Sequence, residues 1–175
     1  GEWQELSGNT FTATETGEHK YEFKAESYAA LESNVTAFTV KIDRQVPVIR
    51  VSFEGTFGRW TGEGVTFNFS TEEASLSGIN YYYDNGNGWT LIDSGTSIEI
   101  TDTTNAVYRF KAVNNAGTES YPSDSYHVMI DAKVPEITLT PEVTDVTPNP
   151  YKINISTEVG ESGLREVTCN GQDIT

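Results

Sequence analysis

The sequence repeats itself after about 87 residues, and this repeat limits the fold more than any other feature. Tyr21-Glu-Phe-Lys-Ala25 returns as Tyr108-Arg-Phe-Lys-Ala112, and Lys41-Ile-Asp43 returns as Met129-Ile-Asp131. Matches at a fixed period are typical of tandem copies of one small domain. We therefore expect an array of one unit. Residues that the copies share are expected to be required by the common fold, and residues that differ are expected to be specific to one copy.

The other part of the unit also occurs twice. Phe67-Asn-Phe-Ser-Thr-Glu72 matches Ile153-Asn-Ile-Ser-Thr-Glu158, and Ser77-Gly-Ile79 matches Ser162-Gly-Leu164. The sequence therefore predicts three parts. Residues 1–44 are expected to be the C-terminal half of a unit, residues 45–132 a complete unit, and residues 133–175 the N-terminal half of another.

Apolar and polar residues alternate along most of the chain, and helical periodicity is nearly absent. Val65, Phe67 and Phe69 alternate with polar residues, for example, and turn sequences such as Asn115-Ala-Gly117 separate the runs. Short alternating strands between turns are typical of an antiparallel β-sandwich. For the complete unit the pattern predicts seven strands, near residues 47–54, 65–71, 79–84, 89–92, 97–101, 107–114 and 125–131.

Comparison of the copies predicts which side chains are buried. Tyr82 aligns with Val167, whereas Tyr81 aligns with Glu166. Because successive side chains of a strand alternate between faces, we expect Tyr82 in the core, with Tyr81 and Tyr83 facing outward. The full predicted core is Ile49, Val51, Phe67, Phe69, Tyr82, Ile98, Ile100, Tyr108, Phe110, Val128 and Ile130.

A set of motifs along the complete unit resembles the bacterial immunoglobulin-like repeats of exported Gram-positive surface proteins. These motifs are Ser77-Gly-Ile79, the aromatic strand Tyr81-Tyr-Tyr83, Gly88-Trp89, the run from Tyr108 to Gly117, and Ile130-Asp131 followed by Val134-Pro135. The flanking halves fit the same pattern, so the resemblance covers the whole chain. It implies immunoglobulin-like sandwiches and an extracellular or cell-wall-associated location, but it implies no particular ligand.

Charge and cysteine content exclude several classes of function. The net charge is −15, which argues against nucleic acid and against adsorption to anionic lipid. No run of about 18 apolar residues occurs, so we expect no membrane insertion. Cys169 is the single cysteine, which leaves no intrachain disulfide and no cysteine-based metal cluster. We find neither a nucleophile–base set nor a phosphate-binding glycine loop, so we do not expect an enzyme.

Two kinds of site remain as weak candidates. Asp43 and Asp131 recur just before Val-Pro, where carboxylates between extracellular domains can hold calcium. The alternative is that each aspartate ends a strand and caps a turn, with no cofactor bound. Aromatic side chains that could stack on a sugar are the second kind, with packing as the alternative. They are Phe57, Trp60, Tyr81, Tyr83 and Trp89.

The leading hypothesis is a non-catalytic structural spacer of an extracellular bacterial protein, with neighbouring immunoglobulin-like repeats as partners. The alternatives are an adhesin or carbohydrate-binding module that contacts a glycan or host protein, and an accessory domain of a glycan-active enzyme. A glycan array separates the first two, and the neighbouring sequence of the parent chain separates the third. Neither half-unit can bury its apolar face alone, which suggests strand exchange between chains. The alternative is that each half packs as a frayed appendage on the central unit.

Overall fold

The protein is built from β-strands. The structure, a computed structural model, describes residues 2–72 and 74–174, and its regular elements in these ranges are all strands. The strands are β1 (Gly17–Phe23), β2 (Thr36–Ile42), β3 (Ile49–Glu54), β4 (Trp60–Thr61), β5 (Val65–Thr71), β6 (Ile79–Asp84), β7 (Thr90–Leu91), β8 (Ser97–Ile100), β9 (Thr104–Asn114), β10 (Tyr126–Ile130), β11 (Glu136–Pro141), β12 (Ile153–Glu158), β13 (Thr168–Cys169) and β14 (Gln172–Asp173). The all-β class expected from the alternating pattern is confirmed.

Two sheets share one core in the middle of the chain, and we call residues 49–130 the central body. One sheet has the strand order β3-β5-β8, and the other has the order β4-β10-β9-β6-β7. Neighbouring strands are antiparallel, except that β4 runs parallel to β10 with Trp60 opposite Met129. The segment between the first two predicted strands thus contributes the short edge strand β4.

The core lies between these two sheets because alternate residues of each strand face inward. The buried apolar residues are Val65, Phe67, Phe69, Tyr81, Ile92, Ile100, Tyr108, Phe110, Ala112, Val128 and Ile130. The rings of Phe67 and Phe110 come from opposite sheets and lie 4.8 Å apart. Among the predicted core residues, Ile49, Val51 and Ile98 are partly buried against this cluster, Tyr82 lies outside it, and the others belong to it.

The predicted orientation of the tyrosines on β6 is wrong. Tyr81 is buried, and Tyr83 packs partly buried against the core, whereas Tyr82 points to the opposite face. The register explains the error, because Tyr81 lies opposite Ala112, a core residue of β9, while Tyr82 lies opposite Lys111. Residues 79, 81 and 83 must share one face of a strand, since the side-chain period is two.

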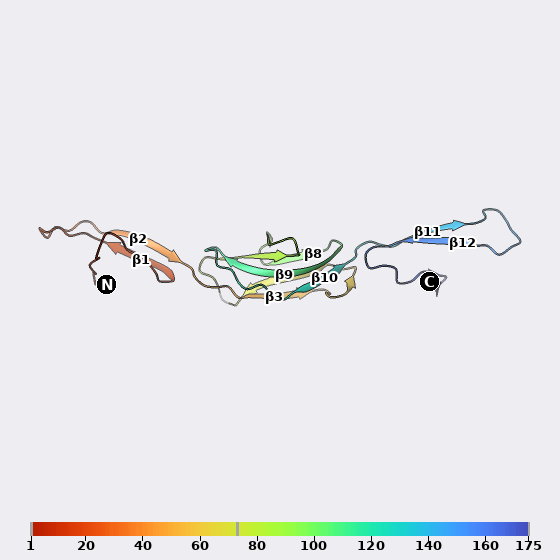
Figure 1. The fold of residues 1–175 in the computed structure, drawn as a ribbon, viewed down its shortest axis with the longest axis horizontal. Helices are drawn as coiled ribbons and strands as arrows, with labels where there is room; N and C mark the ends of the chain where they lie inside the picture. The colour runs from red at the N-terminus through yellow and green to blue at the C-terminus, as the bar shows by residue number, and fades with distance from the viewer. Residues whose placement is uncertain (1, 73, 175) are drawn as a thin grey trace.

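Two hairpins flank the central body. β1 pairs with β2, and β11 pairs with β12, both antiparallel. Figure 1 shows the two hairpins on opposite sides of the central body, so the molecule is elongated. Both hairpins expose apolar side chains, whereas the corresponding strands of the central body bury theirs. The contacts at the junctions between the hairpins and the central body therefore determine how the three parts are arranged.

Candidate functional site

The first junction is organised by the carboxylate of Asp43, directly after β2. Its Oδ2 accepts hydrogen bonds from Ser75 Oγ at 2.6 Å, Ser77 Oγ at 2.7 Å and the Ser77 amide at 3.0 Å. Its Oδ1 accepts one from the Gln45 amide at 3.1 Å. Both serines lie in the loop that precedes β6 of the central body. Asp43 therefore ties the end of the N-terminal hairpin to the central body.

The second junction repeats this arrangement around Asp131, directly after β10. Oδ2 of Asp131 accepts hydrogen bonds from Ser162 Oγ at 2.6 Å and from the Ser162 amide at 2.8 Å. Oδ1 accepts one from the Lys133 amide, as the corresponding oxygen of Asp43 does from Gln45. Gly160 lies so close that a Cβ there would come within 2.0 Å of Oδ1. The absence of a side chain at this position lets the carboxylate approach.

Further polar contacts hold the linker beside each aspartate. In the first linker, the Arg44 guanidinium donates to the Thr14 carbonyl at 3.0 Å, and Asn114 Nδ2 donates to the Gln45 carbonyl at 3.0 Å. In the second, Lys133 Nζ pairs with Glu158 Oε1 at 2.7 Å, and the Ala132 amide donates to Thr103 Oγ1 of the central body at 3.1 Å. Each linker is thus bonded to the parts on both of its sides, which restricts bending at the junction.

These hydrogen bonds stabilise the ionised aspartates. Donation by the Ser75 hydroxyl, and then by Ser77, lowers the pKa of Asp43 from its ordinary value of 3.8 to about 2. The Ser162 hydroxyl and amide likewise lower the pKa of Asp131. Hydrogen bonds to the charged form of a carboxyl group have this effect because they are lost on protonation.

The same donors bear on the calcium hypothesis. Calcium takes six to eight oxygen ligands, whereas backbone N–H groups face both carboxylate oxygens of Asp43 and of Asp131. Across residues 2–72 and 74–174, no group of three or more His, Cys, Asp or Glu side chains is placed to hold a metal ion. The geometry fits a hydrogen-bonded clamp between parts of the chain better than a cation cage.

The aromatic candidates do not form one surface. The rings of Phe57 and Phe53 lie 4.6 Å apart, and Phe57 also contacts Tyr126 at 5.7 Å, so it packs at the margin of the core. Trp60 is partly buried in β4. Tyr81 and Tyr83 face the core, so their rings cannot form an exposed surface on which a sugar could stack. This leaves Trp89, which is 36% exposed, on the opposite face of the sheet.

Trp89 belongs to a cluster on the outer face of the five-stranded sheet. Lys111 Nζ lies 4.8 Å from the centroid of the Trp89 ring and 5.7 Å from that of Tyr82. Lys111 is only 9% exposed, and its ammonium group pairs with Glu119 at 2.8 Å. A cation over an aromatic face is stabilising, the more so when it is shielded from water. The cluster therefore fixes the Trp89 ring against the sheet.

The N-terminal part contains the same three residue types in the same arrangement. Lys24 Nζ lies 5.1 Å from the ring centroid of Trp3 and forms an ion pair with Glu32. Trp3, Lys24 and Glu32 correspond in sequence to Trp89, Lys111 and Glu119. We did not predict this Trp–Lys–Glu cluster, although the recurrence of lysine in Tyr-x-Phe-Lys-Ala was a signal for it.

Asp84 closes the turn that leads to Trp89. Its Oδ1 accepts from the amides of Gly86 and Gly88 at 2.9 and 3.1 Å, and its Oδ2 accepts from Arg109 at 2.7 Å. The Gly86 amide and the Arg109 guanidinium are the main causes that lower the pKa of Asp84. The hydrogen bonds of this carboxylate therefore hold the Asn-Gly turn in place.

The chain was compared with protein-family models, curated proteins and solved structures. No protein-family model, curated protein or solved structure matches this chain significantly. Among the described residues no helix has the length and apolar character needed to cross a membrane.

The depressed pKa of Asp43 predicts that acid weakens the first junction. A carboxyl group with a lowered pKa in the folded state contributes stability that is fully present above its unfolded pKa, here 3.8. That contribution is lost as the pH falls through about 2. The wild type should therefore have a higher urea midpoint than Asp43→Asn at pH 5, and the difference should disappear toward pH 2. A difference that stays constant with pH would contradict this assignment.

Proposed function

We propose that this chain is a non-catalytic structural spacer made of immunoglobulin-like repeats of an extracellular or cell-wall-associated bacterial protein. Its supports are the two-sheet central body, the motifs that resemble such repeats, and the elongated arrangement in Figure 1. A spacer must hold successive units at a fixed separation and orientation. This requirement places the function in the junctions rather than in a ligand-binding cleft.

The observation that carries the proposal is the recurrence of the aspartate–serine contact. Asp43 with Ser77 and Asp131 with Ser162 are pairs of corresponding residues, and each aspartate accepts from both the hydroxyl and the amide of its serine. Hydrogen bonds to a charged group are stronger than neutral ones. Repetition of one such contact at successive junctions would stiffen each junction in the same way.

Binding of a glycan is less well supported as the function. The residues behind that alternative lie apart, since Phe57 packs at the margin of the core and Trp89 lies on the outer face of the five-stranded sheet. Carbohydrate sites need several groups that converge on one surface. The same argument applies to an accessory domain that would present substrate to a glycan-active enzyme.

Spin-label distances test the spacer directly. Labels at Thr39→Cys on β2 and Glu99→Cys on β8, both exposed, would span the first junction in a Cys169→Ser background. Dilution with unlabelled chain removes distances between molecules. We expect one narrow distance distribution in the wild-type junction. It should broaden when Ser75 and Ser77 are both replaced by alanine, because Asp43 then loses both hydroxyl donors from the central body and keeps only the amide of residue 77.

A matched variant controls for the loss of a hydroxyl as such. Ser52→Ala removes an exposed serine from β3 of the same central body and should leave the distribution narrow. A distribution that is already broad in the wild-type junction, and unchanged in the double serine variant, would rule out a stiff spacer.

A further inference from the structure

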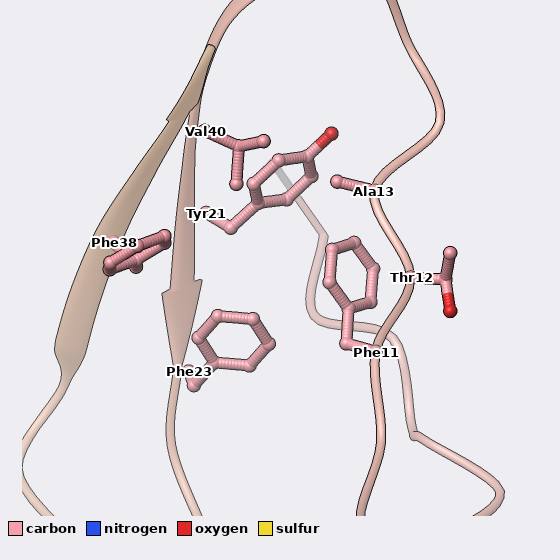
Figure 2. Close-up of a pocket in the computed structure, with 7 residues that line it drawn as sticks. All are labelled: Phe11, Thr12, Ala13, Tyr21, Phe23, Phe38 and Val40. Carbon is pink, nitrogen blue, oxygen red and sulfur yellow. The ribbon is translucent and has the colours of Figure 1, made fainter. Parts of the chain in front are cut away.

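An open apolar hollow lies on the N-terminal hairpin. Its volume is about 480 Å³, and its lining residues are Phe11, Thr12, Ala13, Tyr21, Phe23, Phe38 and Val40. Figure 2 shows the rings of Phe11, Tyr21 and Phe23 in the space between the hairpin and the segment that carries Phe11, whereas the Thr12 side chain points away from it. Phe38 is 67% exposed and Phe11 is 45% exposed. Such a cluster of exposed rings is costly in water and marks a surface that requires a partner.

The lining corresponds to half of the central core. Tyr21 and Phe23 on β1 correspond to Tyr108 and Phe110 on β9, and Phe38 corresponds to Tyr126. Phe11 lies over β1, with its ring centroid 4.7 Å from that of Tyr21, at the position that Ile98 of β8 occupies in the repeat. The hollow is therefore the inner face of one sheet without the strands that would cover it.

The central body defines which strands cover such a face. Phe67 and Phe69 of β5 lie on it there, with ring centroids 4.8 Å from that of Phe110 in both cases. β5 also pairs with β8, with Phe67 opposite Ile98. A strand of the β5 type is therefore expected over the hollow, paired with the segment around Phe11.

The C-terminal hairpin carries a strand of this type. Ile153 and Ile155 of β12 correspond to Phe67 and Phe69, and they are 48% and 43% exposed. β11 and β12 also pair in the same way as β3 and β5. Leu139 lies opposite Ile155, as Val51 lies opposite Phe69. The face that this hairpin would apply to the hollow is thus apolar, correctly spaced and uncovered in the described chain.

The two hairpins of one molecule cannot meet. They lie on opposite sides of the central body (Figure 1), and β9 alone, at about 3.3 Å per residue, is roughly 36 Å long. The linkers after Asp43 and Asp131 are short, and each is bonded to the parts on both of its sides. A contact between the two hairpins can therefore form only from one molecule to another.

We propose that β11–β12 of one chain covers the hollow on β1–β2 of a second copy of the same chain, and so rebuilds a two-sheet body between them. Each copy carries both complementary ends. The contact is therefore head-to-tail, and association continues into a filament unless the rotation closes a ring. This inference rests on the hairpins and on the short, bonded linkers that keep the two hairpins of one molecule apart.

Light scattering after size-exclusion chromatography tests the association. The wild-type chain of 19.3 kDa should elute with a mass above that of the monomer, at least twofold and rising with concentration unless a ring forms. Phe38→Asp places a charge in the hollow, and Ile155→Asp places one on the covering strand. Each variant alone should be monomeric. Tyr121→Asp, at an 87% exposed position of the central body, should associate like the wild type.

Mixing the two variants separates a lost interface from a damaged fold. Ile155→Asp keeps an intact hollow, and Phe38→Asp keeps an intact covering hairpin, so an equimolar mixture should form dimers of twice 19.3 kDa and nothing larger. A wild-type chain that remains monomeric at every concentration, or a mixture that forms no dimer, would overturn the proposal.

Discussion

Replacing Phe67 with alanine should lower the free energy of unfolding of the central body by about 3–5 kcal/mol. The side chain is fully buried, and its ring centroid lies 4.8 Å from that of Phe110 and 5.2 Å from that of Tyr126. Truncation would remove the ring that joins the two sheets and leave a cavity that the surrounding strands cannot close. Urea unfolding followed by far-ultraviolet circular dichroism measures the loss.

Phe57→Ala is the matched control for this substitution. The same atoms are removed, but Phe57 is 40% exposed and contacts only the margin of the cluster, at Phe53 and Tyr126. The expected loss is about 1–1.5 kcal/mol, because less area is returned to water and no closed cavity forms. Equal losses in the two variants would show that the core does not lie between the sheets as described.

The second large effect is expected on β6. Tyr81→Glu should destabilise the central body by about 4 kcal/mol or more, because it buries a carboxyl group without a charged partner. Tyr81 is 6% exposed, and its ring stacks on Phe69 at 5.5 Å between centroids. The same urea experiment measures the change, and part of the population should be unfolded without denaturant.

Tyr82→Glu, one residue further along, should change stability by no more than about 1 kcal/mol. The substitution removes the contact between the Tyr82 ring and Lys111, which lie 5.7 Å apart, but it places a carboxylate near the same ammonium group. If Tyr82→Glu were the more damaging variant, the register of β6 against β9 would be wrong by one residue.

This register also marks where prediction from the sequence ended. Alternation along β5 and β9 gave the buried Phe67, Phe69 and Phe110, because a regular strand has one inward face. On β6 the copies misled, since Glu166 corresponds to Tyr81. In the described chain the C-terminal half has no second sheet over it, so the Glu166 side chain is exposed to water. A charge at this position therefore does not show which face of β6 is buried.

The junctions were predicted only in part. Recurrence identified Asp43 and Asp131, but a repeated aspartate before Val-Pro does not reveal what faces it. Ser77 lies 34 residues beyond Asp43, and Ser162 lies 31 residues beyond Asp131, so their contact depends on how one part docks on the next. The recurrence of Ser-Gly in both copies was the available signal for this contact. The recurring aspartates alone did not show that these serines lie at the junctions.

Carbon-13 NMR titration of the aspartate side chains tests the central claim, that serine donors hold an ionised carboxylate at each junction. We expect Asp43 to titrate with a pKa of about 2 and Asp131 also to titrate below its ordinary value of 3.8. Replacing Ser75 and Ser77 with alanine should raise the pKa of Asp43 alone. If Asp43 and Asp131 both titrate near 3.8 in the wild type, neither junction is held as described.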